Sequence, residues 1–299
     1  MKRACLIGLG MITQRYIQGL GASDYLNICA VSDLNENAIS RPFFDRYPYY
    51  ADYKQMLAEK KPDYVIISTP PQSHFDIAYD CLDKGVNVII EKPVALDIAS
   101  FDALAKLAQE KNLVFRTLFH WHGGIETIAF TRNYNLSRIQ EIRVSVADPY
   151  CADGETINTD RRPLMGAWID SGVNVLSMLR LWLPLKQVEI LDTQVQRCKQ
   201  TNLPIYVNVK LIADGVPTEI TIDWRLGKDS KQTLVKLDDR WVRIGHSEQC
   251  IEDVDVTQYA RMPRLEEHYK HLLGTFDGSS NADLSRSVHE ILFKVRESL

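Results

Sequence analysis

The chain has 299 residues, enough for one large domain or two modest ones. Hydrophobic residues make up 45% and charged residues 25%, which is typical of a globular protein and excludes a low-complexity chain. The net charge of -4, without a cluster of Lys and Arg, argues against nucleic acid as the main partner. No apolar stretch approaches membrane-spanning length, so we expect no membrane partner.

The six cysteines are widely spread and form no CxxC pair, so the sequence predicts neither a zinc site nor a redox pair. Cys5, Cys29 and Cys81 lie in apolar segments and are expected to be buried thiols. This usage fits a reducing cytoplasm, and we read the basic, apolar N-terminus as a first strand instead of a signal peptide.

The first part of the chain alternates short apolar runs with helical stretches. We expect strands at 4–7, 26–31, 64–68, 86–90 and 113–119, and helices at 12–19, 52–60, 72–84 and 100–111. Strands that are apolar throughout and alternate with helices indicate a parallel sheet covered on both faces. We therefore predict an α/β domain of the Rossmann type over residues 1–120.

The second part is rich in β-strands. We expect strands at 139–146, 188–196, 205–212, 217–224, 233–237 and 241–244, with hairpin turns at 213–215 and 238–239 and helices at 172–183, 265–276 and 284–299. Consecutive strands joined in this way predict an α+β domain over residues 121–299 with an open, predominantly antiparallel sheet. The last helices are expected to pack back on the first domain.

A glycine turn separates the first expected strand from the first expected helix. Gly8 and Gly10 would allow a tight turn and the close approach of a pyrophosphate to the helix N-terminus. The full pattern has a glycine or another small residue at the place of Thr13, so the motif is incomplete, and a turn alone also explains both glycines.

The next expected strand ends at Asp33, whose carboxylate would accept hydrogen bonds from the ribose hydroxyls of NAD and repel the 2′-phosphate of NADP. The alternative is a simple turn or helix-capping residue. No arginine follows at once, so NAD is the expected cofactor, with NADP as the second choice.

Two further segments follow strand ends. Thr69-Pro70-Pro71 leaves the strand at 64–68 and leads to His74, and Glu91-Lys92-Pro93 follows the strand at 86–90. Because ligands bind at the carboxyl ends of strands in such sheets, Lys92 is a candidate for acid–base work. The alternative for Thr69-Pro70-Pro71 is a simple rigid turn. The alternative for Lys92 is an ordinary surface lysine.

Together, Gly8-Leu9-Gly10-Met11-Ile12, Thr69-Pro70-Pro71 with His74, and Glu91-Lys92-Pro93 resemble the glucose–fructose oxidoreductase/inositol dehydrogenase family (Gfo/Idh/MocA) of two-domain NAD(P)-dependent enzymes. The resemblance implies that Lys92 reaches the reacting hydroxyl. It also implies a cofactor site, formed by Gly8, Gly10, Met11, Ile12, Asp33, Thr69, Pro70, His74, Glu91 and Lys92.

A further match lies at residues 166–174. The family has Asp and then His four residues later, where this chain has Asp170 and Asn174. Asn cannot act as an acid or base near neutral pH, but it can orient a hydroxyl. This variant resembles the aldose 1-dehydrogenases that act on L-arabinose or D-galactose, and in that branch His120 and Asp148 match substrate contacts. Helix N-capping is the alternative role of Asp170.

The resemblance implies hydride transfer between a sugar or polyol carbon and the nicotinamide, with oxidation of an aldose at C1 to a lactone as its specific form. Lys92 and Asp170 are the expected catalytic residues, with Asn174, His120 and Asp148 in contact with the substrate. A non-catalytic regulator that binds NAD or sugar is the alternative, and reduction of a keto-sugar or an imine is a third reading. We expect no metal and a homodimer or tetramer.

Overall fold

The computed structural model describes residues 1–21, 23–40, 43–151, 153–251 and 264–299. The chain divides into two compact units. The first unit comprises Met1–His120 and Leu265–Arg286, and the second comprises Trp121–Arg264 and Ser287–Leu299. The C-terminal helices are therefore shared between the units, and each unit is described by itself.

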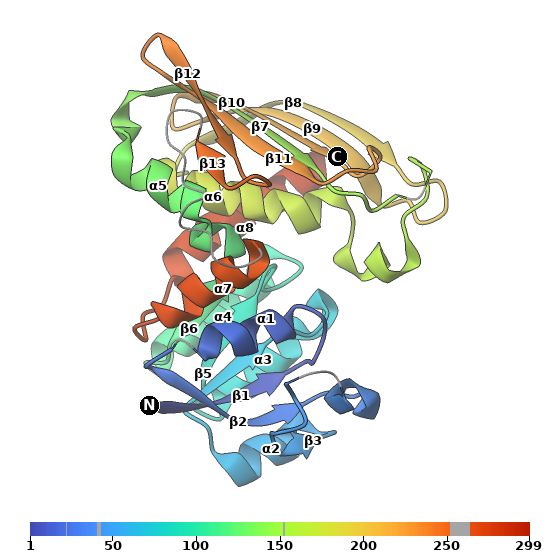
Figure 1. The fold of residues 1–299 in the computed structure, drawn as a ribbon, viewed down its shortest axis with the longest axis vertical. Coiled ribbons are helices and arrows are strands. Elements are labelled where there is room, and N and C mark those ends of the chain that lie inside the picture. The colour runs from blue at the N-terminus through green and yellow to red at the C-terminus, as the bar shows by residue number, and fades with distance from the viewer. Residues whose placement is uncertain (22, 41–42, 152, 252–263) are drawn as a thin grey trace. The chain divides into compact units, whose positions relative to one another are not determined.

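The first unit contains a six-stranded sheet in which every neighbouring pair is parallel, in the order β3-β2-β1-β4-β5-β6 (Figure 1). Its strands are β1 (Lys2–Ile7), β2 (Leu26–Ser32), β3 (Tyr49–Tyr50), β4 (Tyr64–Ile67), β5 (Asn87–Glu91) and β6 (Phe115–Leu118). The order reverses between β1 and β4, which is the point where doubly wound sheets bind their ligands.

Helices cover both faces of this sheet. They are α1 (Thr13–Leu20), α2 (Tyr53–Lys60), α3 (His74–Asp83), α4 (Ile98–Glu110) and α7 (Arg264–Gly274). Apolar side chains of α2, α3 and α4 share one buried cluster with the sheet, and those of α1 and α7 share the other. The apolar strands thus find apolar partners on both sides, as the alternation with helices predicts.

The second unit contains a seven-stranded sheet in the order β13-β12-β11-β7-β10-β9-β8, in which only β10 and β7 are paired in parallel. Its strands are β7 (Ile139–Ala147), β8 (Val188–Arg197), β9 (Pro204–Ala213), β10 (Val216–Asp223), β11 (Ser230–Leu237), β12 (Arg240–Gly245) and β13 (Cys250–Ile251). The predicted fold class, a Rossmann unit and a mostly antiparallel α+β unit, is confirmed.

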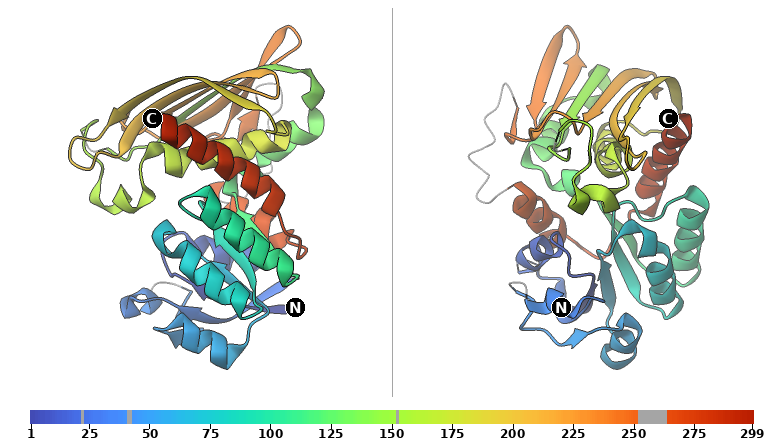
Figure 2. Two further views of the ribbon diagram at one scale, coloured as in Figure 1. Left: turned by 180° about the vertical axis from the view of Figure 1, so that it is seen from behind. Right: turned by 90° about the vertical axis from the view of Figure 1, so that its right-hand side faces the viewer.

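Helix α6 (Val173–Trp182) lies along one face of this sheet (Figure 2) and is buried over most of its length. The hairpin turns fall as predicted, because Asp214, Gly215 and Asp238 have the positive φ angles that tight hairpins require. Helix α8 (Ala282–Ser298) begins in the first unit and ends in the second.

Several elements were not expected from the sequence. The two-residue strands β3 and β13 are too short to show a period, and α5 (Ile125–Asn133) follows the 3₁₀ turn at His120–Gly123. The helix expected from residue 172 is preceded by a π-helical turn at Trp168–Gly172. No helix among the described residues combines the length and the apolar character needed to cross a bilayer.

Candidate active site

The glycine turn at the end of β1 packs closely against the segment that follows β4. Gly8 has a φ of +92°, and a Cβ there would lie 2.7 Å from the backbone nitrogen of Thr69. A side chain at this position would therefore both strain the backbone and collide with its neighbour. Gly8 is required by the fold, and it brings the first two motifs together.

Thr13, the departure from the glycine pattern, is fully buried and has a defined partner. Its hydroxyl donates to the carbonyl of Gly8 at 2.9 Å and lies 2.9 Å from the hydroxyl of Ser68. A threonine thus fits at this place because the turn itself supplies an acceptor for its hydroxyl.

Asp33 lies at the end of β2, beside the same turn. One carboxylate oxygen accepts from the backbone N–H of Leu9 at 2.6 Å, and the other accepts from that of Asn35 at 2.8 Å. The side chain therefore stabilises the turn, which is the alternative role that the sequence allows for Asp33. It also stands next to the glycine turn, where a ribose-binding carboxylate is needed.

Gly10 differs from Gly8, because a Cβ there would have no atom within 4 Å. The space beside it is open, and Met11 next to it is 63% exposed. Helix α1 begins at Thr13, and the side chain of its N-cap residue, Ile12, makes no capping hydrogen bond. Open space beside a helix N-terminus fits a pyrophosphate, so the residues present are compatible with a dinucleotide.

His74 connects the second motif to the third. The ring is buried, with Nε2 at 2.7 Å from the carbonyl oxygen of Thr69 and Nδ1 at 2.8 Å from that of Pro93. Burial lowers the pKa of His74, and the two carbonyl contacts act in the opposite direction. His74 therefore holds the loops after β4 and β5 together and has no ring nitrogen left for a ligand.

Glu91 is buried at the end of β5. One of its carboxylate oxygens accepts from the hydroxyl of Tyr16 on α1 at 2.5 Å and from that of Tyr269 on α7 at 2.7 Å. The other oxygen accepts from the backbone N–H of Lys92 at 3.1 Å. Burial raises the pKa of Glu91, against the opposing effects of Lys92 and the tyrosines.

This arrangement fixes the backbone from which the half-buried side chain of Lys92 projects. His120, at the end of the same unit, lies next to Tyr269 and stacks on His268, with the two Nδ1 atoms 3.2 Å apart. In the first unit, Glu91 and His120 thus both contact residues of α7, and Lys92 follows Glu91 directly in the chain.

In the second unit, Asp148 lies at the end of β7 and is only 5% exposed. One carboxylate oxygen is 2.6 Å from Nζ of Lys231, which is also buried, and the other accepts from the hydroxyl of Ser171 at 3.0 Å. Asp148 is therefore held in a buried ion pair that reaches the residue next to Asp170.

Asp170 lies inside the π-helical turn and does not cap a helix, because the N-cap position belongs to Ala167. The side-chain amide of Asn174 donates to the backbone carbonyl of Asp170 at 3.1 Å. The amide oxygen of Asn174 is buried and has no hydrogen-bond partner in the described part of the chain. Such an orphaned acceptor is the kind of atom that a ligand hydroxyl satisfies.

Tyr150 completes this group. Its ring lies beneath the guanidinium of Arg161 at 4.7 Å and meets Trp224 edge-on at 5.0 Å. Burial raises the pKa of Tyr150, and the next largest cause is the negative charge of Asp170. The hydroxyl therefore stays protonated and can donate a hydrogen bond.

Sequence reasoning missed Tyr16, Tyr269, Tyr150 and Lys231. Only Lys231 left a signal that could have been found. It occupies the buried phase of the alternating strand β11, together with Thr233, Val235 and Leu237. A lysine at an inward position needs a buried partner, and Asp148 is the carboxylate that provides it.

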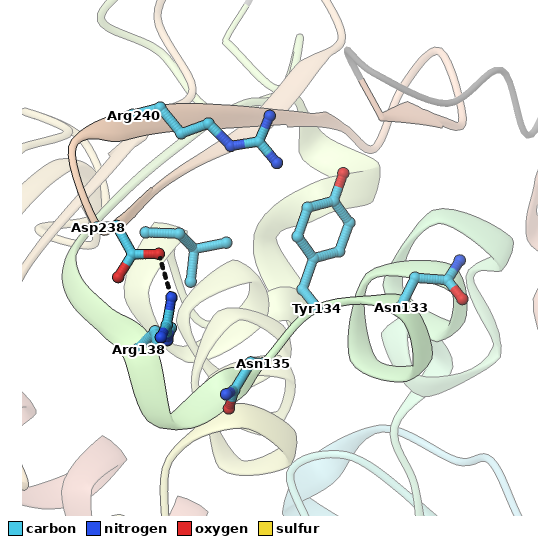
Figure 3. Close-up of a pocket in the computed structure, with 7 residues that line it drawn as sticks. Asn133, Tyr134, Asn135, Arg138, Asp238 and Arg240 are labelled. Carbon is cyan, nitrogen blue, oxygen red and sulfur yellow. Dashed lines mark hydrogen bonds and ion pairs between the residues drawn. The ribbon is translucent and has the colours of Figure 1, made fainter.

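A pocket of about 570 Å³ lies elsewhere in the second unit, and none of the predicted site residues lines it. Figure 3 shows Arg138 and Asp238 turned toward each other there, joined by an ion pair at 3.0 Å, with Tyr134 and Arg240 nearby. Within the described ranges, no group of three or more His, Cys, Asp or Glu side chains could hold a metal ion.

The strand order and the glycine turn define the first unit as a dinucleotide-binding Rossmann unit. Residues 2–119 match the model of the Gfo/Idh/MocA family, described as "Oxidoreductase family, NAD-binding Rossmann fold". This part of the chain therefore matches the Gfo/Idh/MocA oxidoreductase family, as the motifs within it predict.

Two curated relatives illustrate the match. The chain is 35% identical over 113 residues to UDP-N-acetylglucosamine 3-dehydrogenase of Acidithiobacillus ferrooxidans, over 38% of this chain and 35% of the relative. It is 27% identical over 112 residues to inositol 2-dehydrogenase 1 of Saccharopolyspora erythraea, over 36% of this chain and 33% of the relative. The chain therefore matches about a third of the length of each relative.

The solved structure of the Acidithiobacillus ferrooxidans enzyme is similar over 100% of this chain and 97% of that one, with a TM-score of 0.80. The sequence identity in this comparison is 19%, so the likeness establishes the fold of the whole chain.

Proposed function

We propose that the protein is an NAD-dependent dehydrogenase of a sugar or a related polyol. The main support is that the ends of β1, β2, β4 and β5 bring Gly8, Asp33, Thr69 and Lys92 to one edge of the Rossmann sheet. The names of two relatives, UDP-N-acetylglucosamine 3-dehydrogenase and inositol 2-dehydrogenase, favour a hydroxyl-bearing ring as substrate.

In this proposal Gly8, Gly10, Met11 and Ile12 form the cradle for the pyrophosphate, and Asp33 binds the ribose. Thr69, Pro70 and the loop held by His74 line the other side of the cofactor. Asp33 favours NAD, since its carboxylate would repel a 2′-phosphate, and NADP is the alternative. Bound NAD supplies the carbon that accepts the hydride.

Lys92 in its neutral amine form, directly or through a water, accepts the proton of the substrate hydroxyl as the hydride leaves. Its backbone is fixed through Glu91, Tyr16 and Tyr269, which limits the positions that its Nζ atom can reach. Proton transfer by a positioned side chain is worth about 10²–10⁴-fold in rate.

Asp170 and Asn174, which lie in the second unit, are proposed to bind hydroxyls of the substrate. The orphaned amide oxygen of Asn174 would accept one hydroxyl hydrogen, and the carboxylate of Asp170 another. His120 and Asp148 are proposed as further substrate contacts. Oxidation of an aldose at C1 to a lactone is the specific reaction that we propose to test first.

The test is to mix the purified protein with NAD or NADP and a panel of aldoses, inositols and UDP-N-acetylglucosamine, and to record absorbance at 340 nm. We expect turnover with NAD, and a loss of about 10²–10⁴-fold in kcat for Lys92→Met. Lys84→Met, which changes an exposed lysine of the same unit, is the matched control and should leave kcat unchanged. Absence of turnover with every pair would contradict the proposal.

A non-catalytic regulator that binds NAD or sugar is the second candidate, and Asn174 in place of a titratable residue favours it. Thr13, the departure from the glycine pattern, does not favour this candidate, because its hydroxyl is satisfied within the turn. Calorimetry that shows cofactor binding without turnover of any substrate would favour the regulator. Reduction of a keto-sugar or an imine is tested with NADH and a panel of keto-sugars and imines, in which turnover lowers the absorbance at 340 nm. Assembly into a dimer or tetramer is proposed on the open sheet of the second unit.

A further inference from the structure

An irregularity in the pairing of β1 with β2 brings two cysteines together. Ala4 pairs with Ile28, but the next residue, Cys5, pairs with Ala30, so Cys29 is an extra residue on β2. Such a bulge re-aims the side chain of the extra residue. Cys29 consequently packs on the same buried cluster as Cys5 and Ala30, and its Sγ lies 3.5 Å from the Sγ of Cys5.

The two thiols differ in their surroundings. Cys5 is fully buried, whereas Cys29 is half-buried and lies near the positive charges of Arg3 and Lys60. The hydrogen bond between the sulfurs and these cations lower the pKa of Cys29, and the same bond together with burial raises the pKa of Cys5. The first proton therefore leaves Cys29, which becomes the nucleophilic thiolate.

We propose that Cys5 and Cys29 form an oxidisable dithiol, with Cys29 as the sulfur that attacks a hydroperoxide and Cys5 as the sulfur that resolves the product. This role is independent of the proposed dehydrogenase activity. It also reverses the expectation, drawn from the absence of a CxxC motif, that the chain holds no redox pair. A bulge brings together sulfurs that are 24 positions apart in the sequence.

The chemistry balances with hydrogen peroxide as the oxidant. The thiolate of Cys29 attacks one oxygen, the O–O bond breaks, and Cys29 becomes a sulfenic acid as hydroxide leaves. The thiol of Cys5 then attacks the sulfur of Cys29, the S–O bond breaks, and water leaves as the disulfide forms. In sum, two thiols and one peroxide give one disulfide and two waters.

The backbone can accommodate this product. Cys5 and Cys29 lie on neighbouring strands, which are about 4.7–4.9 Å apart, and disulfides join Cα atoms about 4.4–6.8 Å apart. The sulfurs must approach each other by about 1.5 Å, from 3.5 Å to a bond of about 2.05 Å. Rotation about the side-chain bonds supplies this movement, and the disulfide would tie β1 to β2.

The test is to treat the purified, reduced full-length protein with hydrogen peroxide, count the free thiols, and map peptides by mass spectrometry without reduction. We expect the loss of two thiols and a decrease of about 2 Da, from one linkage between the peptides that contain Cys5 and Cys29. Cys29→Ser should abolish the linkage, and Cys5→Ser should leave a sulfenic acid at Cys29 that dimedone traps.

Cys81→Ser is the matched control, since Cys81 is a buried thiol on the same face of the sheet whose pKa is raised to about 12 by burial. This variant should still form the linkage. Circular dichroism of each variant separates a chemical effect from a failure to fold. A linkage between any other two cysteines, first oxidation at a cysteine other than Cys29, or a stable sulfinic acid at Cys29 without the linkage would each overturn the proposal.

Discussion

The two units each bury a carboxylate beside their candidate site residues, but they stabilise it in opposite ways. Glu91 is 7% exposed and Asp148 is 5% exposed, so burial does not distinguish them. Glu91 accepts hydrogen bonds from two neutral phenols and one backbone amide, whereas Asp148 pairs with the ammonium group of Lys231. The partners therefore decide how each site responds to mutation and to pH.

The comparison predicts that the ion pair is the more fragile of the two arrangements. Lys231→Met leaves Asp148 buried without its cation, which should lower the free energy of unfolding by about 3–5 kcal/mol. Denaturation in urea measures this loss. Lys210→Met, which removes an exposed lysine from β9 of the same sheet, is the control and should have little effect.

The double variant Asp148→Asn with Lys231→Met sharpens this prediction, because it removes both charges. It should recover much of the stability lost by Lys231→Met alone. Equal losses for Lys231→Met and Lys210→Met would show that the buried pair does not carry the stability of this region.

Removal of the tyrosine hydroxyls that donate to Glu91 should have the next largest effect on stability. Tyr269→Phe and Tyr16→Phe each remove one hydrogen bond to a carboxyl group, and each should lower the free energy of unfolding by about 1.5–3 kcal/mol. If the tyrosines act through Glu91, the cost of each should shrink in a Glu91→Gln background. Tyr79→Phe on the exposed face of α3 is the control, and additive losses would contradict the coupling.

The smallest expected effect is a change in the free energy of unfolding with pH that arises from the titration of Glu91. Because burial raises the pKa of Glu91 in the folded state, the folded protein binds this proton more tightly than the unfolded chain does. The contribution of Glu91 to stability is therefore greatest below its unfolded pKa, near 4.3, and falls as pH rises toward the folded pKa. Urea unfolding across pH 4–8 should show wild type losing stability relative to Glu91→Gln as pH rises, and a constant difference would contradict this assignment.

Much of the first unit could be predicted from the chain. The apolar runs and the spacing of the helices predict the parallel sheet, and the motifs Gly8-Leu9-Gly10 and Glu91-Lys92-Pro93 follow their strands directly. The two motifs are then expected at the same edge of the sheet, because the carboxyl ends of parallel strands lie on one side. The role of Thr13 could not be predicted, because its hydroxyl depends on the carbonyl of Gly8, which the turn orients.

The second unit was less predictable at its site. The sequence predicts its strands and two of its hairpins, but the four-residue spacing of Asp170 and Asn174 suggests two side chains on one regular helical face. The π-helical turn changes that geometry, and Asn174 instead bonds the backbone of Asp170. The turn also accommodates Trp168 against Gly172, where a Cβ would lie 2.8 Å from the indole ring.

The sequence by itself determined the order of the elements, the Rossmann class of the first unit and the motifs at its strand ends, because each depends on residues close together in the chain. Only the tertiary structure decided the partners of the buried groups: Tyr269 for Glu91, 178 positions away, Lys231 for Asp148, and Cys29 for Cys5. These pairs depend on strand register, on a bulge and on helix packing. In the low-dielectric interior each of these partners contributes to stability, because a buried polar group without a partner raises the free energy of the folded state.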